Sequence, residues 1–260
     1  MNFQDFVKHL LLIFSIITLF QSCVSKREML YLQDVESLNN TEVIYTNHTL
    51  QVDDILKISV GALIPEAAIP YNKNSGGSVV ANSIDVMKLD GYLVSQNSTI
   101  NFPILGELSV KDKTTKDLEN DIKKLLFDGG YLINPSVNVR LLNAKVTILG
   151  EVNKPGTYTI ANEQVSLPQA LALAGDLSIT GKRANLLLLR EEGGILTKNY
   201  IDLRSDALFN SPYYFLKPND VLYVEPNASK VRSSTDALRY TSISLSVITT
   251  LTTIASILLR

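Results

Sequence analysis

Hydrophobic and polar positions change period along the chain, and this change predicts an α+β fold. Apolar residues alternate with polar ones over residues 50–60 and 136–142, as on half-buried strands. Over residues 115–127 the apolar positions recur every three or four residues, as on one face of a helix. We therefore expect residues 44–143 to fold as a first α+β unit, with a long irregular loop at 62–84.

A second unit is expected over residues 144–227, because short strand patterns there surround one predicted helix at 167–174. Strands curled around a single short helix are typical of a β-grasp module. The segment 191–199 contains Gly193-Gly194 and is expected to form a turn. The strands of this unit are expected at 146–152, 157–160, 186–190, 200–203 and 221–225.

Short motifs predict where both helices begin and end. Thr114 with Asp117, and Ser166 with Gln169, have the spacing of a capping box. In that motif each side chain bonds the backbone N–H of the other residue, so the first turn of the helix is stabilised. Glycine follows each helix and favours a C-terminal cap.

One short pattern occurs twice, at Leu50–Ile58 and at Leu216–Val224. Both copies read Leu, two residues, an acid or amide, Asp, an aliphatic residue, Leu, any residue and an aliphatic residue. In each copy the Asp is expected to cap a turn that leads into a strand. Asp53-Asp54 could also be read as a carboxylate pair for acid–base chemistry. The repeat favours the turn. Adjacent residues on a strand also point to opposite faces of the sheet, so Asp53 and Asp54 would not act as a pair.

The first residues have the pattern of a secretory signal. Residues 1–22 combine a short polar start with an apolar run at 10–20 that is too short to cross a bilayer. Cys23 is the only cysteine and follows a small residue, Ser22. The arrangement resembles the lipobox of bacterial lipoproteins, whose cysteine is acylated; the alternative is an ordinary cleaved signal. Residues 23–43 are polar and are expected to be a tether.

A membrane-spanning helix is predicted within residues 228–260. Residues 240–259 carry no charge, and a helix of that length is about 30 Å long, enough for a bilayer core. At about 100° per residue, five hydroxyl side chains fall on one narrow arc. Such a stripe fits a helix that faces water within an assembly; alternatively, the hydroxyls only bond helix carbonyls or neighbouring helices. The candidate pore-lining residues are Ser242, Ser246, Thr249, Thr253 and Ser256.

Composition narrows the functional classes. The 260 residues include 24 Lys and Arg against 26 Asp and Glu, so there is no basic field to bind nucleic acid. One cysteine allows no intrachain disulfide, and two histidines leave little for a metal site. The sequence contains no nucleophile elbow, P-loop or dinucleotide-binding motif. We therefore expect a protein that is not an enzyme and that uses neither metal nor cofactor.

Several motifs resemble those of one family of exporters. Segments that look like the polysaccharide biosynthesis/export domain are 50–58, 102–106, 115–127 and 134–139. Segments that look like the soluble-ligand-binding (SLBB) β-grasp domain are 150–158 and 169–175. The order of lipoprotein cysteine, export domain, β-grasp domain and terminal helix is similar to that of Wza-like outer-membrane polysaccharide export lipoproteins.

The resemblance implies a homo-oligomeric ring that passes a capsular polysaccharide or exopolysaccharide chain without chemistry. Each subunit would contribute its terminal helix to a helical barrel through the outer membrane of a Gram-negative bacterium. The protein would be lipid-anchored, with periplasmic domains, and an inner-membrane polysaccharide co-polymerase or tyrosine kinase would dock beneath it. Val24, directly after the candidate lipid cysteine, favours the outer membrane.

Two other functions remain open on the sequence. One is a periplasmic lipoprotein adaptor ring that serves a separate pore. The other is a saccharide-binding lipoprotein without its own pore. Because the chain has no Trp, aromatic contacts with sugar would use Tyr or Phe. Tyr71 and Tyr213-Tyr214 are candidates for such contacts, with core packing as the alternative.

Overall fold

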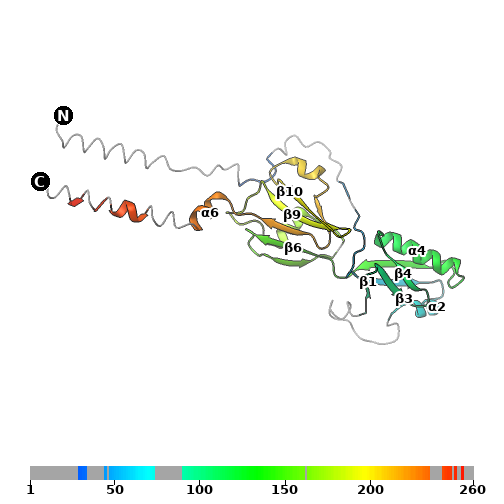
Figure 1. The fold of residues 1–260 in the computed structure, drawn as a ribbon. Helices are drawn as coiled ribbons and strands as arrows, with labels where there is room; N and C mark the ends of the chain where they lie inside the picture. Colours follow the sequence, from blue (N-terminus) through cyan, green and yellow to red (C-terminus); the bar gives the residue numbers. More distant parts are fainter. Residues whose placement is uncertain are drawn as a thin grey trace.

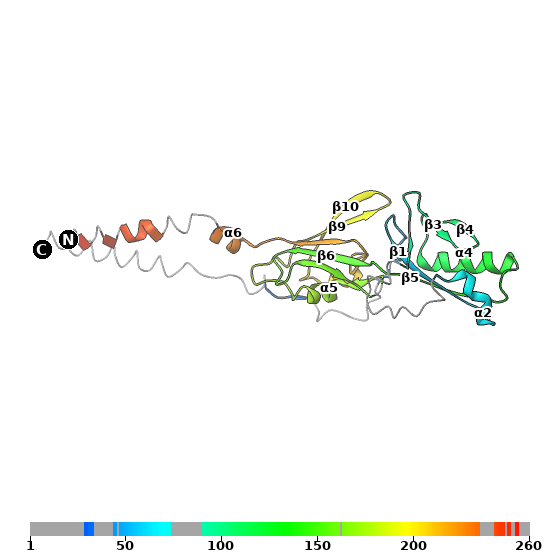
Figure 2. The same cartoon turned by 90° about the horizontal axis from the view of Figure 1, so that it is seen from below.

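The protein consists of two α+β units that follow each other along the chain, in agreement with the predicted class (Figure 1). The first unit carries α2 and α4 at one end, and α6 lies at the far end of the second unit in both views (Figure 2). The computed structural model describes residues 29–33, 44–45, 47–73, 90–161, 163–234, 242–247, 249–250 and 253–254.

The first unit is built on a three-stranded antiparallel sheet covered by one helix. Strand β1 (Ile55–Gly61) lies between β2 (Tyr92–Leu93) and β5 (Ser136–Leu141). Helix α4 (Thr115–Asp128) packs on β5. Short elements complete the unit: α2 (Pro65–Ala68), η3 (Ile69–Tyr71), β3 (Thr99–Phe102) and β4 (Gly106–Ser109).

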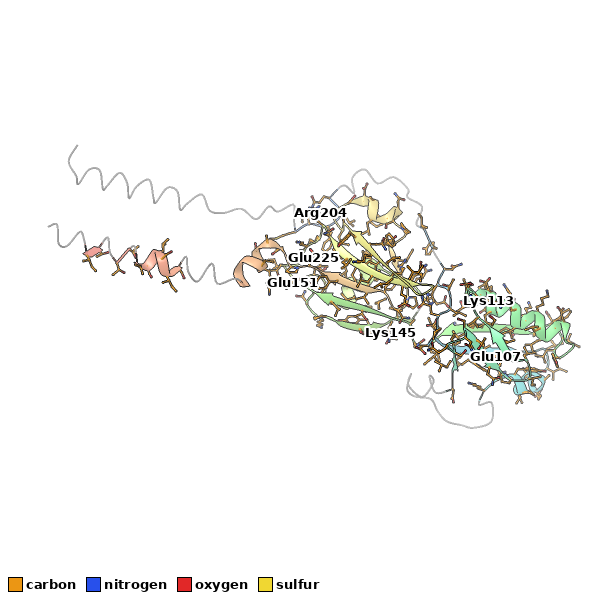
Figure 3. All side chains as sticks on the ribbon, in the orientation of Figure 1. Glu107, Lys113, Lys145, Glu151, Arg204 and Glu225 are labelled. Carbon is orange, nitrogen blue, oxygen red and sulfur yellow. The ribbon has the colours of Figure 1, made fainter. Side chains whose placement is uncertain are left out.

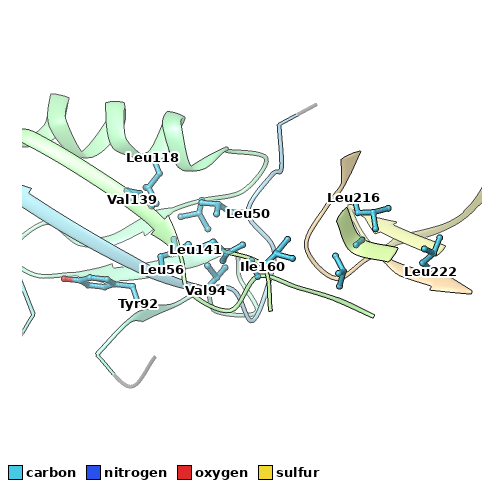
Figure 4. Close-up of a cluster of buried hydrophobic side chains, with 14 of the residues drawn as sticks. Leu50, Leu56, Tyr92, Val94, Leu118, Val139, Leu141, Ile160, Leu216 and Leu222 are labelled. Atoms are coloured by element: carbon cyan, nitrogen blue, oxygen red, sulfur yellow. The ribbon is translucent and has the colours of Figure 1, made fainter. Parts of the chain in front are cut away.

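Alternation along β1 and β5 divides this sheet into a buried face and an exposed face. Leu56, Ile58 and Val60 on β1 are buried, as is Val139 on β5, which Figure 4 shows next to Leu118 of α4. The residues between them are polar and exposed. One face of the sheet therefore packs in the core, and the other presents polar side chains to solvent.

The second unit is a five-stranded mixed sheet with one helix. Its strands run in the order β10–β9–β12–β6–β7, and β12 is parallel to β6 while the other pairs are antiparallel. These strands are β6 (Lys145–Gly150), β7 (Gly156–Thr159), β9 (Leu186–Glu192), β10 (Ile195–Ile201) and β12 (Val221–Val224). The other elements are β8 (Val165–Ser166), α5 (Leu167–Leu173), η4 (Asp206–Asn210), β11 (Phe215–Leu216) and α6 (Ala228–Ser234).

Both predicted capping boxes are confirmed. The N–H of Asp117 donates to Thr114 Oγ1 at 3.1 Å, and the N–H of Thr114 donates to Asp117 Oδ2 at 3.0 Å. At α5 the N–H of Gln169 donates to Ser166 Oγ at 3.4 Å, and the N–H of Ser166 donates to Gln169 Oε1 at 3.1 Å. Each pair satisfies two backbone donors that have no partner within the helix.

Two segments differ from the prediction. The segment 191–199 is not one long turn, because β9 continues to Glu192 and β10 begins at Ile195 around a tight turn at Gly193-Gly194. Both glycines have positive φ, 58° and 77°, which this connection requires. Strand β10 is an edge strand exposed on both faces, so it lacks the alternation that marks a half-buried strand. The predicted loop at 62–84 contains α2 and η3.

The repeated pattern forms the same turn in both units. The N–H of Gln51 donates to Asp54 Oδ2 at 2.8 Å, and the N–H of Lys217 donates to Asp220 Oδ2 at 2.8 Å. The residue before each Asp has positive φ, 69° and 67°. Asp54 and Asp220 are 2% and 1% exposed. The structural interpretation of Asp53-Asp54 is therefore confirmed.

Tyr92 buries a hydroxyl group that has no hydrogen-bond partner among the described residues. The ring stacks on Phe102 with centroids 5.6 Å apart, and Lys73 Nζ lies 4.2 Å from its centroid. Burial raises the pKa of Tyr92 to about 12 from 10.0. The folded state therefore favours the neutral phenol. The contribution of this group to the free energy of unfolding is fully present below pH 10 and is lost as the pH rises through 12.

Tyr92→Phe is expected to raise the free energy of unfolding by about 1 kcal/mol, because it removes the unsatisfied hydroxyl and keeps the ring. Urea unfolding at neutral pH measures this gain. The same titration between pH 10 and 12 should show a loss in the wild type that is smaller in Tyr92→Phe. If the free energy of unfolding of the two proteins depended on pH in the same way, the raised pKa of Tyr92 would be contradicted.

A polar cleft between the two units as the candidate functional site

A cleft with a volume of about 1030 Å³ lies between the two units. The first unit contributes polar side chains from the exposed face of β1 and β5. The second unit contributes residues from the end of β7, from the segment before α5 and from β11. The lining residues are Tyr45, Lys57, Ser59, Asn138, Arg140, Leu141, Leu142, Thr159, Ile160, Ala161, Glu163, Gln164, Gln169 and Phe215.

Strand register places two cations side by side in this cleft. Lys57 on β1 pairs directly with Arg140 on β5, and Ser59 pairs with Asn138. Directly opposed residues on antiparallel strands have Cβ atoms about 5 Å apart, and like charges at such positions repel. Within the part of the chain that the structure describes, neither Lys57 nor Arg140 forms a salt bridge. Glu163 is the acidic residue that lines the cleft.

An aromatic pair forms part of the cleft wall. The rings of Tyr45 and Phe215 stack with centroids 4.7 Å apart and an interplanar angle of 25°. Tyr45 is 71% exposed, although a side chain of this size is usually buried more deeply. Phe215 is held from behind by an edge contact with Tyr214 at 5.0 Å. The wall therefore offers an accessible aromatic surface beside polar groups.

The tyrosines proposed from the sequence for sugar contacts pack in the protein instead. Tyr71 is 6% exposed and makes an edge contact with Tyr131. Tyr213 lies under the guanidinium group of Arg190 at 5.6 Å, and Tyr214 packs against the core. The packing alternative is therefore the correct one. The exposed Tyr45 carried no sequence signal, because it lies in the irregular segment before β1 and outside any motif.

The second unit holds the start of α6 through a charged network at its outer end, where Figure 3 labels Glu151 and Glu225. Lys182 pairs with Glu225 at 2.7 Å, and Lys230 of α6 lies 3.8 Å from Glu151. Hydrogen bonds from Thr180 and Ser178, with the charge of Lys230, hold the pKa of Glu151 below its usual value. These contacts fix where the chain leaves the second unit towards its C-terminal segment.

The site residues predicted from the sequence lie near the two ends of the chain. Cys23 and Ser256 lie outside the described residues, whereas Ser242, Ser246, Thr249 and Thr253 are helical. The hydroxyl of Ser246 donates to the Ile243 carbonyl at 2.8 Å, that of Thr249 to the Ser246 carbonyl at 2.9 Å, and that of Thr253 to the Thr249 carbonyl at 2.7 Å.

These bonds use the hydroxyl proton and leave the oxygen lone pairs on the helix surface. Bonding to helix carbonyls was the alternative to a water-facing stripe, and the two are compatible, so pore lining stays a prediction. Among the described residues, none of the helices is both long enough and apolar enough to cross a membrane.

Two pairs of buried charged or titratable residues contact each other within the described segments. His48 lies buried, with Nε2 3.4 Å from Asp54 Oδ2. Arg190 donates to both carboxylate oxygens of Asp220, at 2.9 and 2.7 Å. No group of three or more His, Cys, Asp or Glu side chains within the described segments could hold a metal ion.

Comparison with known proteins finds a family similar to the first unit. Residues 44–142 match the family model described as polysaccharide biosynthesis/export protein. The match agrees with the resemblance seen in the sequence motifs, and the matched range contains the sheet β2–β1–β5 and helix α4.

Two curated relatives extend the similarity beyond residues 44–142. The EPS I polysaccharide export outer membrane protein EpsA of Ralstonia solanacearum is 29% identical over 205 residues, which cover 75% of this chain and 52% of the relative. The protein of the same name from Ralstonia nicotianae is 30% identical over 151 residues, covering 56% of this chain and 39% of the relative. The chain thus spans about half the length of these relatives or less.

Proposed function

We propose that this protein is an outer-membrane component that exports a capsular polysaccharide or exopolysaccharide. The observation that carries the proposal is the match of residues 44–142 to the polysaccharide biosynthesis/export family. Both relatives are named as export proteins of the outer membrane, and one aligns over 75% of this chain. The polymer passes without covalent chemistry, which fits a polar cleft whose charged groups are not arranged for catalysis.

For the assembly that carries out export, we propose a homo-oligomeric ring of lipid-anchored subunits. Residues 144–227 act as the SLBB β-grasp domain; support comes from the central parallel pair β6 and β12 and from the single helix α5. Cys23 carries the lipid, and the segment 240–259 forms a stave of a helical barrel. The hydroxyl oxygens of Ser246 and Thr253 then face a wet lumen, where uncharged polar groups let sugar slide.

The arrangement of the two units supports an orientation for the subunit. Helix α6, from which the C-terminal segment continues, lies at one end of the protein, and the export domain lies at the other (Figure 1). A C-terminal segment in the outer membrane therefore directs the export domain into the periplasm. An inner-membrane co-polymerase or tyrosine kinase docks at that end.

Deleting the gene is expected to abolish polysaccharide at the cell surface, and a plasmid copy of the full chain should restore it. Surface polymer and polymer retained inside the cell are measured separately. A rise in the retained fraction on deletion supports an export step. Unchanged surface polymer in the deletion strain would remove the proposed function.

The adaptor alternative makes a different prediction. If a separate protein forms the pore, an unrelated membrane-spanning helix should replace residues 240–259 without loss of export. The channel proposal predicts that this exchange abolishes export while the protein still reaches the outer membrane, as measured by fractionation of the two membranes.

A further inference from the structure

The paired cations of the cleft, Lys57 and Arg140, form no salt bridge within the described part of the chain, so both are available to a bound anion. The register of β1 and β5 places Lys57 and Arg140 directly opposite each other, so both side chains start from the same point of the sheet face. Their aliphatic neighbours on the same strands are buried, which fixes the face on which both side chains emerge. The fold thus maintains a local repulsion that a bound anionic group would relieve.

We propose that this cleft binds a carboxylate-bearing stretch of the exported polysaccharide. The proposal rests on the export function and specifies the class of cargo. Arg140 can take a carboxylate through two parallel N–H donors, and Lys57 adds a second positive charge beside it. The chain has a formal net charge of −2, so an acidic polymer is drawn to this local feature and not to the protein as a whole.

The rest of the cleft selects a sugar chain over other acidic polymers. Tyr45 presents an exposed ring face, held in place by Phe215, and the flat C–H face of a sugar ring can cover it. Gln169 accepts the Ser166 N–H through Oε1, and its amide group remains a donor for sugar hydroxyls. A volume of about 1030 Å³ accommodates a ligand of several sugar rings.

The binding is expected to be weak enough for the polymer to be released as it moves along. Lys57 and Arg140 are exposed, so water and salt screen them, and each contact with a carboxylate is individually modest. A passing chain with repeated carboxylates can exchange one for the next at the same pair of cations. The cleft would thereby guide acidic polymer past each subunit.

The test measures binding of oligogalacturonate to the purified full-length protein by calorimetry, with a neutral maltooligosaccharide of equal length as the comparison. Lys57→Gln combined with Arg140→Gln should weaken oligogalacturonate binding by at least about tenfold. The matched control is Lys123→Gln combined with Lys198→Gln, which removes the same charge from exposed positions outside the cleft. The control should bind as the wild type does.

Thermal unfolding separates loss of binding from loss of folding. Removing the repulsion should leave the cleft variant at least as stable as the wild type, so weaker binding cannot reflect a damaged fold. Equal weakening in the cleft variant and the control would overturn the proposal, as would absence of oligogalacturonate binding or equal binding of the neutral oligosaccharide. Polyglutamate that binds the cleft as tightly as oligogalacturonate would show an acidic-protein site and also overturn it.

Failure of this proposal can be told apart from failure of the export function. If the full-length wild-type chain restores surface polysaccharide while oligogalacturonate does not bind, the export function stands and the cleft proposal falls. If the wild-type chain restores nothing, the export function itself falls.

Discussion

Replacing Asp220 with Ala is expected to lower the free energy of unfolding by about 3–5 kcal/mol, because it leaves the Arg190 guanidinium buried without its counter-charge. The two residues are 1% and 5% exposed, and two N–H groups of Arg190 donate to the carboxylate. Asp220 also holds the turn before β12 by accepting the N–H of Lys217. Urea unfolding of the full chain measures the loss.

The chain provides a matched control in the exposed pair Asp202 and Arg204. Here too an arginine donates to both oxygens of an aspartate, at 3.1 and 2.9 Å, but the side chains are 37% and 36% exposed. Asp202→Ala should lower the free energy of unfolding by less than about 1 kcal/mol, because water solvates the exposed Arg204 guanidinium when the carboxylate is removed. Similar losses in the two variants would show that burial is not what makes Asp220 important.

Ser246→Leu combined with Thr253→Leu is expected to reduce surface polysaccharide to the level of the deletion strain. Both residues lie on the predicted hydroxyl stripe, and an apolar ring at this face would dewet a lumen formed by several copies. Leu is a good helix former, so the substitutions should not disturb the helix itself. Export is measured as surface polymer per cell at equal protein abundance in the outer membrane.

The control for this prediction uses the neighbouring positions. Val247→Leu combined with Ile254→Leu places the same side chain about 100° away on the helix, on the apolar arc. That variant should export at the wild-type level. Equal tolerance of both pairs would mean that the hydroxyls act only through the carbonyl bonds that the structure shows for Ser246 and Thr253.

Much of the fold was predictable where the physical cause is local. The capping boxes at Thr114 and Ser166 depend on residues three apart, and the repeated turn at Asp54 and Asp220 depends on a carboxylate that accepts a nearby N–H. The prediction of a strand at 200–203 found only the end of β10, and residues 195–199 were assigned to a turn because this exposed edge strand has no hydrophobic alternation there. Strands are predicted from the alternation of apolar and polar residues, and a strand whose two faces are both exposed does not need that alternation.

The cleft could not be predicted from the sequence. Alternation places Lys57 and Arg140 on polar faces of their strands, but only the register of β1 and β5 shows that they are directly opposed. Tyr45 and Phe215 are 170 positions apart and meet only through the packing of the two units. Sites assembled from distant residues depend on tertiary structure, which one sequence does not reveal.

The assembly of this chain into its own export channel is the central claim, and imaging of the detergent-extracted full-length protein tests it most directly. The comparison is a version ending at Ser234, the last residue of α6. The account predicts a ring with a helical barrel in the full-length protein and a ring without a barrel in the shortened one. Monomers in both samples would contradict it.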